Sequence, residues 1–242
     1  TVLSRGLGDV YKRQIYYEST HYWYAGEYFI SEDGQHIIGK QKVGNVSTNN
    51  QGPLSYRDRS TNNWIMTGSS SVQLGGSRGK VNGDFTKAFL ITHPRSPTTY
   101  TLKKYSGTTS NRENIAKYAH TTNNGWSTVD THSSEMEIDM SFDGNIFIYS
   151  KGTAIRISRD GGTNFENVSS NVFTNITEWK LLSMSSDAQT IVAVSNDSMY
   201  LSRDIGYTWE KFSSSKIDDV GNITHIDISN EMIVYYENND LA

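Results

Sequence analysis

A repeat with a period of 44 residues constrains the fold of this chain more than any other feature of its sequence. When the chain is shifted by 44 residues, segment 141–170 aligns with segment 185–214 without a gap. The nine aligned pairs that are identical are Ser141/Ser185, Asp143/Asp187, Ser158/Ser202, Arg159/Arg203, Asp160/Asp204, Gly162/Gly206, Glu166/Glu210, Ser169/Ser213 and Ser170/Ser214. A period of this length is typical of stacked units that bury their apolar surface against one another.

Each repeat shows the alternation of β-strands rather than the periodicity of a helix. Polar and apolar residues alternate at 155–157, whereas 191–194 is a continuous apolar run that suits a strand buried on both faces. Four short strands in each repeat correspond to one blade of a β-propeller. We therefore expect an all-β propeller of four-stranded antiparallel blades. Only segment 110–113 has the form of a helical capping box, and it predicts a short insertion.

Two turn motifs recur at the same place in the repeat. Residues 202–209 read Ser-Arg-Asp-Ile-Gly-Tyr-Thr-Trp, and residues 158–165 read Ser-Arg-Asp-Gly-Gly-Thr-Asn-Phe. The Asp can accept hydrogen bonds from its own turn, Gly supplies a positive φ, and the aromatic residue can be buried between sheets. Degraded copies are expected at 121–127 and at 56–60. The structural residues of the two full copies are Ser158, Asp160, Gly162, Phe165, Ser202, Asp204, Gly206, Thr208 and Trp209.

The motif at 202–209 resembles the Asp box of the sialidase-like propellers, which are also called BNR repeats. The resemblance extends over residues 28–242 and implies that each box joins the third strand of a blade to the fourth. The family includes sialidases, other glycoside hydrolases, sorting-receptor ectodomains, photosystem assembly factors and viral surface proteins. Its boxes lie away from the active sites of the enzymes, so the motif indicates architecture rather than chemistry.

The repeat also predicts how the chain is divided. Unit starts are expected near residues 31, 92, 141, 185 and 229, so that four to five blades of an incomplete propeller lie within residues 15–242. The last unit ends before any box. Residues 1–14 lack the Asn, Ser and Thr richness of the rest and resemble a translated sequencing adapter, as found in metagenomic data. We expect them to be a non-native or disordered leader.

Composition excludes several classes of site. The chain has no cysteine, which excludes disulfides, thiol catalysis and cysteine-ligated zinc. Its formal net charge is -4 and no basic face is evident, so a nucleic-acid partner is not expected. No apolar run approaches the ~20 residues of a membrane helix. The six histidines are scattered and each box has a single carboxylate, so we expect neither a metal nor another cofactor.

The acidic cluster at 135–139 is the first candidate for catalysis. It leads into the innermost strand of a blade, where alternation would point Glu135, Glu137 and Asp139 to one side near the central channel. Paired carboxylates there could serve the acid and base steps of glycoside hydrolysis. The alternative is an acidic rim that keeps the mouth of the channel hydrated.

Three arginines are the second candidates. The resemblance to sialidases implies an arginine triad for a substrate carboxylate, and Arg57, Arg95 and Arg112 could supply guanidinium groups from the early blades. The Arg-Ile-Pro motif of catalytic sialidases does not occur. The alternative is that these arginines are solvated loop residues.

The order of strands predicts which connections share a face. The box turns are expected on the same face as the first tight turns at 32–34 and 142–144. The longest connections are expected on the opposite face, where propellers usually bind ligands, and they are 40–57, 68–87, 103–117, 129–137, 169–179 and 213–224.

These observations favour a non-catalytic recognition propeller that binds a glycan or a protein ligand on its long-loop face. Loops rich in Tyr, Trp, Asn and Ser suit stacking on sugars and adaptable hydrogen bonding. One alternative is an exo-sialidase-like glycoside hydrolase whose other catalytic residues lie outside this sequence. Another is a structural component, for example of a virion surface. An extracellular or surface-exposed location is favoured.

Overall fold

The computed structural model describes ten stretches of the chain. They are residues 28–42, 51–58, 63–66, 79–92, 99–119, 121–168, 170–212, 220, 223–228 and 233–237. The expected leader at 1–14 lies outside the described residues.

The described residues form four antiparallel sheets of four strands each and one sheet of two strands. Within each sheet the strands are hydrogen-bonded in chain order. The first sheet contains β1 (Tyr28–Ile30), β2 (His36–Lys42), β3 (Gln51–Asp58) and β4 (Asn63–Met66). The second sheet contains β5 (Gly79–Val81), β6 (Lys87–Thr92), β7 (Tyr100–Ser106) and β8 (Trp126–His132).

The remaining sheets repeat this pattern. The third sheet contains β9 (Ile138–Met140), β10 (Phe147–Lys151), β11 (Ala154–Ser158) and β12 (Glu166–Val168). The fourth sheet contains β13 (Trp179–Met184), β14 (Ile191–Ser195), β15 (Met199–Ser202) and β16 (Glu210–Phe212). The two-stranded sheet contains β17 (Ile223–Ile228) and β18 (Ile233–Glu237).

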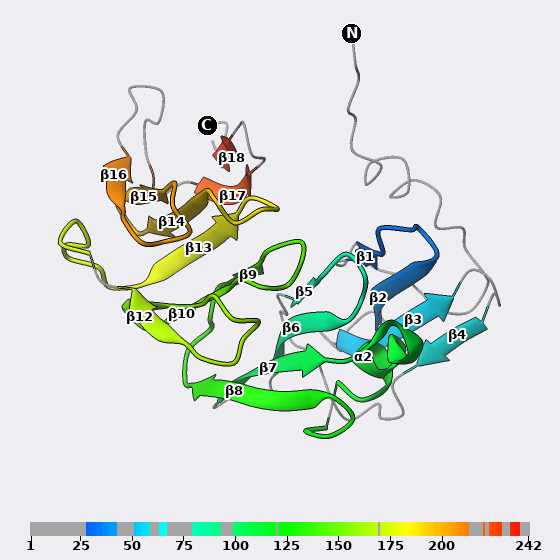
Figure 1. Ribbon diagram of the computed structural model, residues 1–242. Helices are drawn as coiled ribbons and strands as arrows, with labels where there is room; N and C mark the ends of the chain where they lie inside the picture. The colour runs from blue at the N-terminus through cyan, green and yellow to red at the C-terminus, as the bar shows by residue number, and fades with distance from the viewer. Residues whose placement is uncertain are drawn as a thin grey trace, which may run out of the picture.

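The sheets are arranged radially about a common axis. Figure 1 shows the first strand of each sheet (β1, β5, β9, β13) on the inside and the fourth strand (β4, β8, β12, β16) on the outside. Adjacent inner strands β5, β9, β13 and β17 contact one another. This is the arrangement of a β-propeller, as the repeat predicted, with four blades and two strands of a further sheet among the described residues.

Apolar side chains fill the space between neighbouring sheets. Between the third and fourth sheets, Ile148 and Ile157 pack with Trp179, Tyr200 and Trp209. Equivalent clusters lie between the first and second, second and third, and fourth and fifth sheets. The fourth sheet is covered on one face by the third sheet and on the other by the fifth, so its strand β14 is buried along its whole length.

A tight turn of one form joins the first strand to the second in each four-stranded sheet. We call these the entry turns, and they are residues 31–36, 82–87, 141–146 and 185–190. In the third sheet the buried Ser141 donates from Oγ to Oδ1 of Asp143 at 2.6 Å and accepts the backbone N–H of Ile146 at 2.9 Å. The pKa of Asp143 is lowered, because hydrogen bonds from Ser141 and Asn145 outweigh the effect of burial, which raises it.

Neighbouring entry turns are joined to one another by backbone hydrogen bonds. The N–H of Glu32 donates to the carbonyl oxygen of Gly83 at 2.8 Å, and the N–H of Gly83 donates to that of Phe142 at 2.9 Å. The N–H of Phe142 donates in turn to the carbonyl oxygen of Ser186 at 2.8 Å. One such hydrogen bond therefore passes between each adjacent pair of the four four-stranded sheets, on a single face of the propeller.

The second unit begins at Asn82, not near residue 92 as the repeat had suggested. Thr92 is the last residue of β6, the second strand of its sheet. Asn82 takes the place of the entry-turn serine, because its Oδ1 accepts the N–H groups of Thr86 at 3.0 Å and Lys87 at 2.7 Å. Phe85 adopts the positive φ, 59°, that Gly34 and Gly144 adopt in the equivalent turns.

This shift also changes two of the predicted long connections. The expected connection 68–87 contains β5 and the second entry turn, which lies on the other face. Residues 107–125 connect β7 to β8, the third and fourth strands of their sheet, and so lie on the face of the entry turns rather than opposite to it. The expected short helical insertion is here, as η1 (Thr109–Asn111) and α2 (Asn114–Lys117). The N-cap residue is Thr108 in η1 and Glu113 in α2, rather than Ser110. Among the described residues, no helix has the length and apolar character needed to span a membrane.

The insertion is anchored through buried side chains. Ile115 and Ala116 are fully buried between the first two sheets. Lys103 is 7% exposed, and its Nζ donates to the carbonyl oxygens of Ala119 at 3.1 Å and Thr121 at 3.0 Å. Burial lowers the pKa of Lys103.

Two fully buried tyrosines provide a matched test of this packing. The hydroxyl of Tyr105 donates to the carbonyl oxygen of Asn111 at 2.9 Å. Burial raises the pKa of Tyr105 to about 12. The hydroxyl of Tyr200, by contrast, has no hydrogen-bond partner among the described residues. We predict that Tyr105→Phe lowers the free energy of unfolding by about 1–2 kcal/mol. Tyr200→Phe should leave it unchanged or raise it by up to about 1 kcal/mol, because an unpaired buried hydroxyl is removed.

Urea denaturation of both variants and the parent protein checks this prediction. An equal loss of stability in the two variants would contradict the assigned packing of Tyr200.

Candidate functional site

The segments 158–165 and 202–209, here called the box turns, occupy equivalent corners of adjacent sheets. In the third sheet, Ser158 Oγ donates to Asp160 Oδ1 at 2.7 Å and accepts the N–H of Gly162 at 2.9 Å. In the fourth sheet the same contacts, Ser202 to Asp204 and Gly206 to Ser202, measure 2.9 Å and 2.8 Å. Each box turn joins the third strand of its sheet to the fourth.

The box carboxylates are held by their own turns. Backbone N–H groups of Thr163 and Asn164 each donate to Oδ1 of Asp160 at 2.9 Å, and that of Thr208 donates to Asp204 at 2.8 Å. The hydrogen bond from the Asn164 backbone, followed by that from Ser158, holds the pKa of Asp160 well below its usual range. Each carboxylate is thereby kept ionised as an acceptor at the centre of its turn.

Each box ends in an aromatic residue that packs toward the preceding sheet. Trp209 lies in the cluster shared with the third sheet, and Phe165 packs on Phe89 of the second, with ring centroids 6.2 Å apart. The degraded copy at 121–127 keeps the hydroxyl hydrogen bond and the buried aromatic residue of a box. Thr121 Oγ1 donates to Asn123 Oδ1 at 2.6 Å, and Trp126 is 2% exposed.

The suggested copy at 56–60 is out of register by one residue. Ile37 and Phe147 each lie six residues after the first residue of their entry turn. Ile37 pairs with Arg57, and Phe147 pairs with Ser158. Arg57 rather than Tyr56 therefore stands at the position of the box serine. Residues 59–60 lie outside the described residues.

Adjacent box turns are joined through Arg159. Its Nε and Nη2 donate to the carbonyl oxygen of Ile205 in the next sheet at 3.1 and 2.8 Å, and its guanidinium lies 3.9 Å from the ring centroid of Tyr207. Its Nη1 pairs with Glu166. Arg203 occupies the same place in the fourth sheet and lies 3.7 Å from Glu210, but its side chain is 67% exposed.

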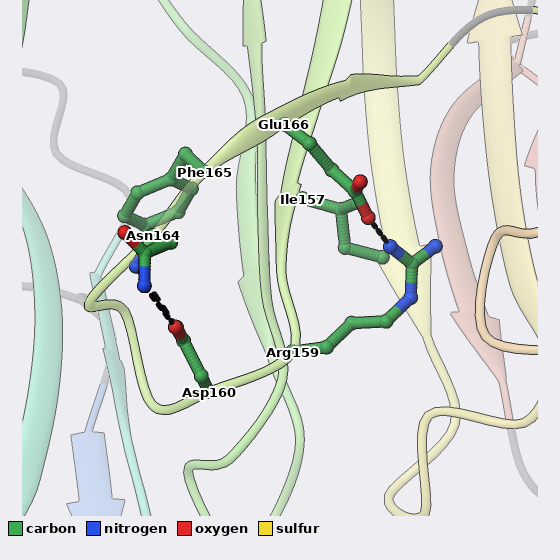
Figure 2. Close-up of a pocket in the computed structure, with 6 residues that line it drawn as sticks. All are labelled: Ile157, Arg159, Asp160, Asn164, Phe165 and Glu166. Atoms are coloured by element: carbon green, nitrogen blue, oxygen red, sulfur yellow. Dashed lines mark hydrogen bonds and ion pairs between the residues drawn. The ribbon is translucent and has the colours of Figure 1, made fainter.

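A small pocket of about 280 Å³ lies at the box turn of the third sheet (Figure 2). Its lining residues are Ile157, Arg159, Asp160, Asn164, Phe165 and Glu166. The figure shows the Arg159–Glu166 pair on one side and the Asp160–Asn164 contact on the other. Each charged group of the pocket is thus already engaged, Arg159 with Glu166 and Asp160 with Asn164, so we assign them a structural role in the corner.

The acidic cluster is divided between different environments. Asp139 is buried on the inner strand β9, where its Oδ1 accepts the N–H of Met140 at 2.7 Å and lies 3.1 Å from Nζ of Lys80 on β5. Its Oδ2 accepts the N–H of Met184 on β13 at 2.8 Å. Asp139 therefore joins three neighbouring inner strands. Glu137 is 6% exposed, and Glu135 is exposed.

The candidate arginines lie elsewhere. Arg112 belongs to the insertion, where its Nε donates to the carbonyl oxygen of Asp84 at 2.7 Å and its Nη1 lies 3.7 Å from Asp33. Arg57 is half-buried near the end of β3 on the same face, and Arg95 lies outside the described residues. Arg57 and Arg112 are thus at the entry-turn face, whereas Glu135 precedes β9 at the opposite face. The structure does not bring the described candidates into one site.

One polar network escaped the sequence analysis. Asp130 on β8 accepts the hydroxyl of Tyr149 at 2.8 Å and pairs with Nζ of Lys151 at 2.5 Å, which joins the second and third sheets. Burial and the hydrogen bond to Asp130 both raise the pKa of Tyr149. The period-two spacing of Tyr149 and Lys151 on one strand is the only sequence signal of this contact.

No group of three or more possible metal ligands occurs within the described part of the chain.

Comparison with known proteins supports the fold and nothing finer. No family model and no curated protein matches the chain. The β-propeller domain of the trilobed protease from Pyrococcus furiosus, which has an open velcro topology, aligns with a TM-score of 0.52 and 10% identity over 86% of this chain and 63% of that one. The Dos1 propeller aligns with a TM-score of 0.48 and 10% identity over 81% and 46%.

A third solved structure, a functionally unknown protein from Desulfotomaculum acetoxidans, aligns with a TM-score of 0.43 and 12% identity over 81% of this chain and 56% of that one. The chain spans less than two thirds of the length of these three proteins. At such identities the similarity to the protease domain shows the fold alone, and that fold is a β-propeller.

The two box arginines allow a matched test of the contact between corners. We predict that Arg159→Ala lowers the free energy of unfolding by about 2 kcal/mol, because two charge-assisted hydrogen bonds and the stacking on Tyr207 are lost. Arg203→Ala should change it by less than about 0.5 kcal/mol, because its side chain is mostly exposed. Thermal and urea unfolding measure both values, and equal effects would refute the contact.

Proposed function

We propose that this chain is a recognition propeller that binds a glycan or a protein ligand on the face opposite the entry and box turns, here called the long-loop face. We further propose that it is a relative of the sialidase-like Asp-box propellers. The equivalent geometry of the two box turns supports this relationship, since both serine–aspartate pairs and both glycines occupy corresponding positions.

The observation that carries the binding proposal is a set of exposed polar side chains on a firmly anchored base. The described part of the long-loop face includes the β8–β9 connection and most of the β12–β13 connection. Their exposed hydrogen-bonding residues are Ser133, Ser134, Glu135, Asn171, Thr174, Asn175, Thr177 and Glu178. Polar side chains presented on a rigid scaffold are suited to recognising hydroxyl and amide groups of a ligand.

The base of the β12–β13 connection is fixed by aromatic packing. Phe173 packs against Trp179, Tyr200 and Trp209 with ring centroids 5.0–5.3 Å apart. Nε1 of Trp179 donates to the carbonyl oxygen of Thr153 at 3.0 Å, which ties the β12–β13 connection to the neighbouring β10–β11 turn. Because folding already orders this surface, a ligand that binds there causes little further loss of conformational entropy in the protein.

The acidic cluster favours binding over glycoside hydrolysis. A hydrolase requires two carboxyl groups facing the scissile bond across an open site. Both oxygens of Asp139 are instead engaged by Met140, Met184 and Lys80, and Glu137 is buried beside it in the chain. These contacts support a role in holding the inner strands together.

A binding assay with a variant of each face tests the proposal. We predict that the triple substitution Asn171→Ala, Thr174→Ala and Glu178→Ala lowers the affinity for a glycan identified on an array by at least about tenfold, because several ligand hydrogen bonds are lost. A double Arg203→Ala, Glu210→Ala variant, changed only on the box face, is the matched control and should bind like the parent.

If the control variant loses affinity, or if the triple variant binds like the parent protein, the ligand-binding site lies elsewhere. Turnover of fluorogenic glycosides by the parent protein would contradict a non-catalytic role. If the array is silent, the same two variants are compared with a peptide library as the ligand.

A further inference from the structure

The chain contains five steps in which Asp or Asn precedes Gly. They are Asp33–Gly34, Asn82–Gly83, Asn124–Gly125, Asp143–Gly144 and Asp160–Gly161. Because glycine has no side chain, its main-chain nitrogen can reach the side-chain carbonyl carbon of the preceding residue and close a five-membered ring. Ring closure needs a side chain that is free to turn toward that nitrogen and that carries a neutral leaving group.

Asn82 is locked by its entry turn. Its side chain is buried, and its Oδ1 accepts the N–H groups of Thr86 and Lys87 at 3.0 and 2.7 Å. Its Nδ2 donates to Oδ1 of Asp84 at 2.7 Å. Turning the amide toward Gly83 would break all three hydrogen bonds in a buried place, so the reaction requires local unfolding.

The three aspartates are protected by the hydrogen bonds of their turns and by ionisation. Oδ1 of Asp33 accepts the N–H of Gln35 at 3.0 Å, and Oδ1 of Asp143 accepts that of Asn145 at 2.9 Å. Asp160 is held in the same way in its box turn. Hydrogen bonds lower the pKa of all three, which keeps them as carboxylates, and a carboxylate resists nucleophilic attack.

Asn124 differs in each of these respects. It is exposed, its amide is neutral, and the one side-chain hydrogen bond that the structure gives it is donated by Nδ2 to Oδ1 of the neighbouring Asn123 at 3.1 Å. It stands at φ 53° in a tight turn, closed by the N–H of Trp126 donating to the carbonyl oxygen of Asn123 at 3.1 Å, and Gly125 follows at φ 94°. Within the described part of the chain, no turn donor holds the carbonyl group of its side chain.

We propose that Asn124 is a site of spontaneous deamidation and isoaspartate formation in the folded protein. The Gly125 nitrogen loses its proton to water and forms a bond to Cγ of Asn124, and the side-chain amide leaves as ammonia. Water then opens the resulting succinimide. Cleavage of the bond from the Gly125 nitrogen to Cγ leaves an ordinary aspartate in place of Asn124, and cleavage of its bond to the main-chain carbonyl carbon gives isoaspartate.

The modification would alter a corner that positions a core residue. Trp126 is 2% exposed, and its Nε1 donates to the carbonyl oxygen of Asn114 in α2 at 3.0 Å. The carbonyl oxygen of Gly125 accepts the N–H of Ser106 at 2.9 Å. Isoaspartate adds a methylene group to the main chain between these anchors and also adds a negative charge. The inference is independent of the proposed ligand-binding function.

Peptide mapping of the aged protein tests the proposal. The full chain is incubated at mildly alkaline pH and body temperature, digested at intervals, and analysed by mass spectrometry together with an isoaspartate-specific methylation assay. We expect the Asn124 peptide to be converted at least about tenfold faster than the Asn82 peptide, because conversion of Asn82 requires local unfolding.

Two controls distinguish the structure from the local sequence. In concentrated urea the two peptides should be converted at similar rates, since the entry turn that protects Asn82 is then lost. Asn124→Gly, which suits a positive φ, should remove the modified species from that peptide. Conversion of Asn82 in the folded protein as fast as that of Asn124, or an unmodified Asn124, would overturn the proposal.

Discussion

The hydrogen bonds that pass from one entry turn to the next are the interaction on which the rest of this structure depends. They run from Glu32 to Gly83, from Gly83 to Phe142 and from Phe142 to Ser186, once between each adjacent pair of the four four-stranded sheets. Each turn presents its N–H and carbonyl group in this way only because the first residue and the aspartate fix its shape from within. A buried serine or asparagine thus sets both the corner of its own sheet and the position of the neighbouring sheet.

The outer corners repeat this principle with side chains. Arg159 spans two box turns, and the box aromatics Trp126, Phe165 and Trp209 pack toward the preceding sheet. At the inner strands, Asp139 joins β5, β9 and β13. Apolar packing supplies most of the favourable free energy of stacking, but it is not directional, and these polar contacts fix the register of one sheet on the next.

The sequence was most informative where the local chemistry was most regular. In segments 141–170 and 185–214 the serine and aspartate of both turn types, and the glycine of the box turn, recur at a fixed spacing, and the structure has antiparallel strands between them. The start of the second unit was wrong because Asn82 and Phe85 perform the roles of serine and glycine with different side chains. A search for hydrogen-bonding equivalence at that position, rather than for identical residues, would have found it.

The candidate site was less predictable than the fold, for a related reason. The repeat placed Asp139 on an inner strand. It could not show that both carboxylate oxygens are bound by residues on β9, β13 and β5, because the contacts to β13 and β5 span 45 and 59 residues of chain. The same holds for Arg112, whose partners in the first two entry turns are set by the docking of the insertion. Contacts between sheets arise from tertiary packing, for which a single sequence carries no periodic signal.

Amide hydrogen exchange of the entry turns tests the central claim most directly, because the proposed bonds join exposed turns of different sheets. The account predicts that the amides of Gly83 and Phe142 exchange as slowly as those in β14, although Phe142 is half exposed, while the adjacent amide of Asp143 exchanges rapidly. Exchange of Gly83 and Phe142 as fast as that of Asp143 would show that no bond links the turns, and it would contradict the account.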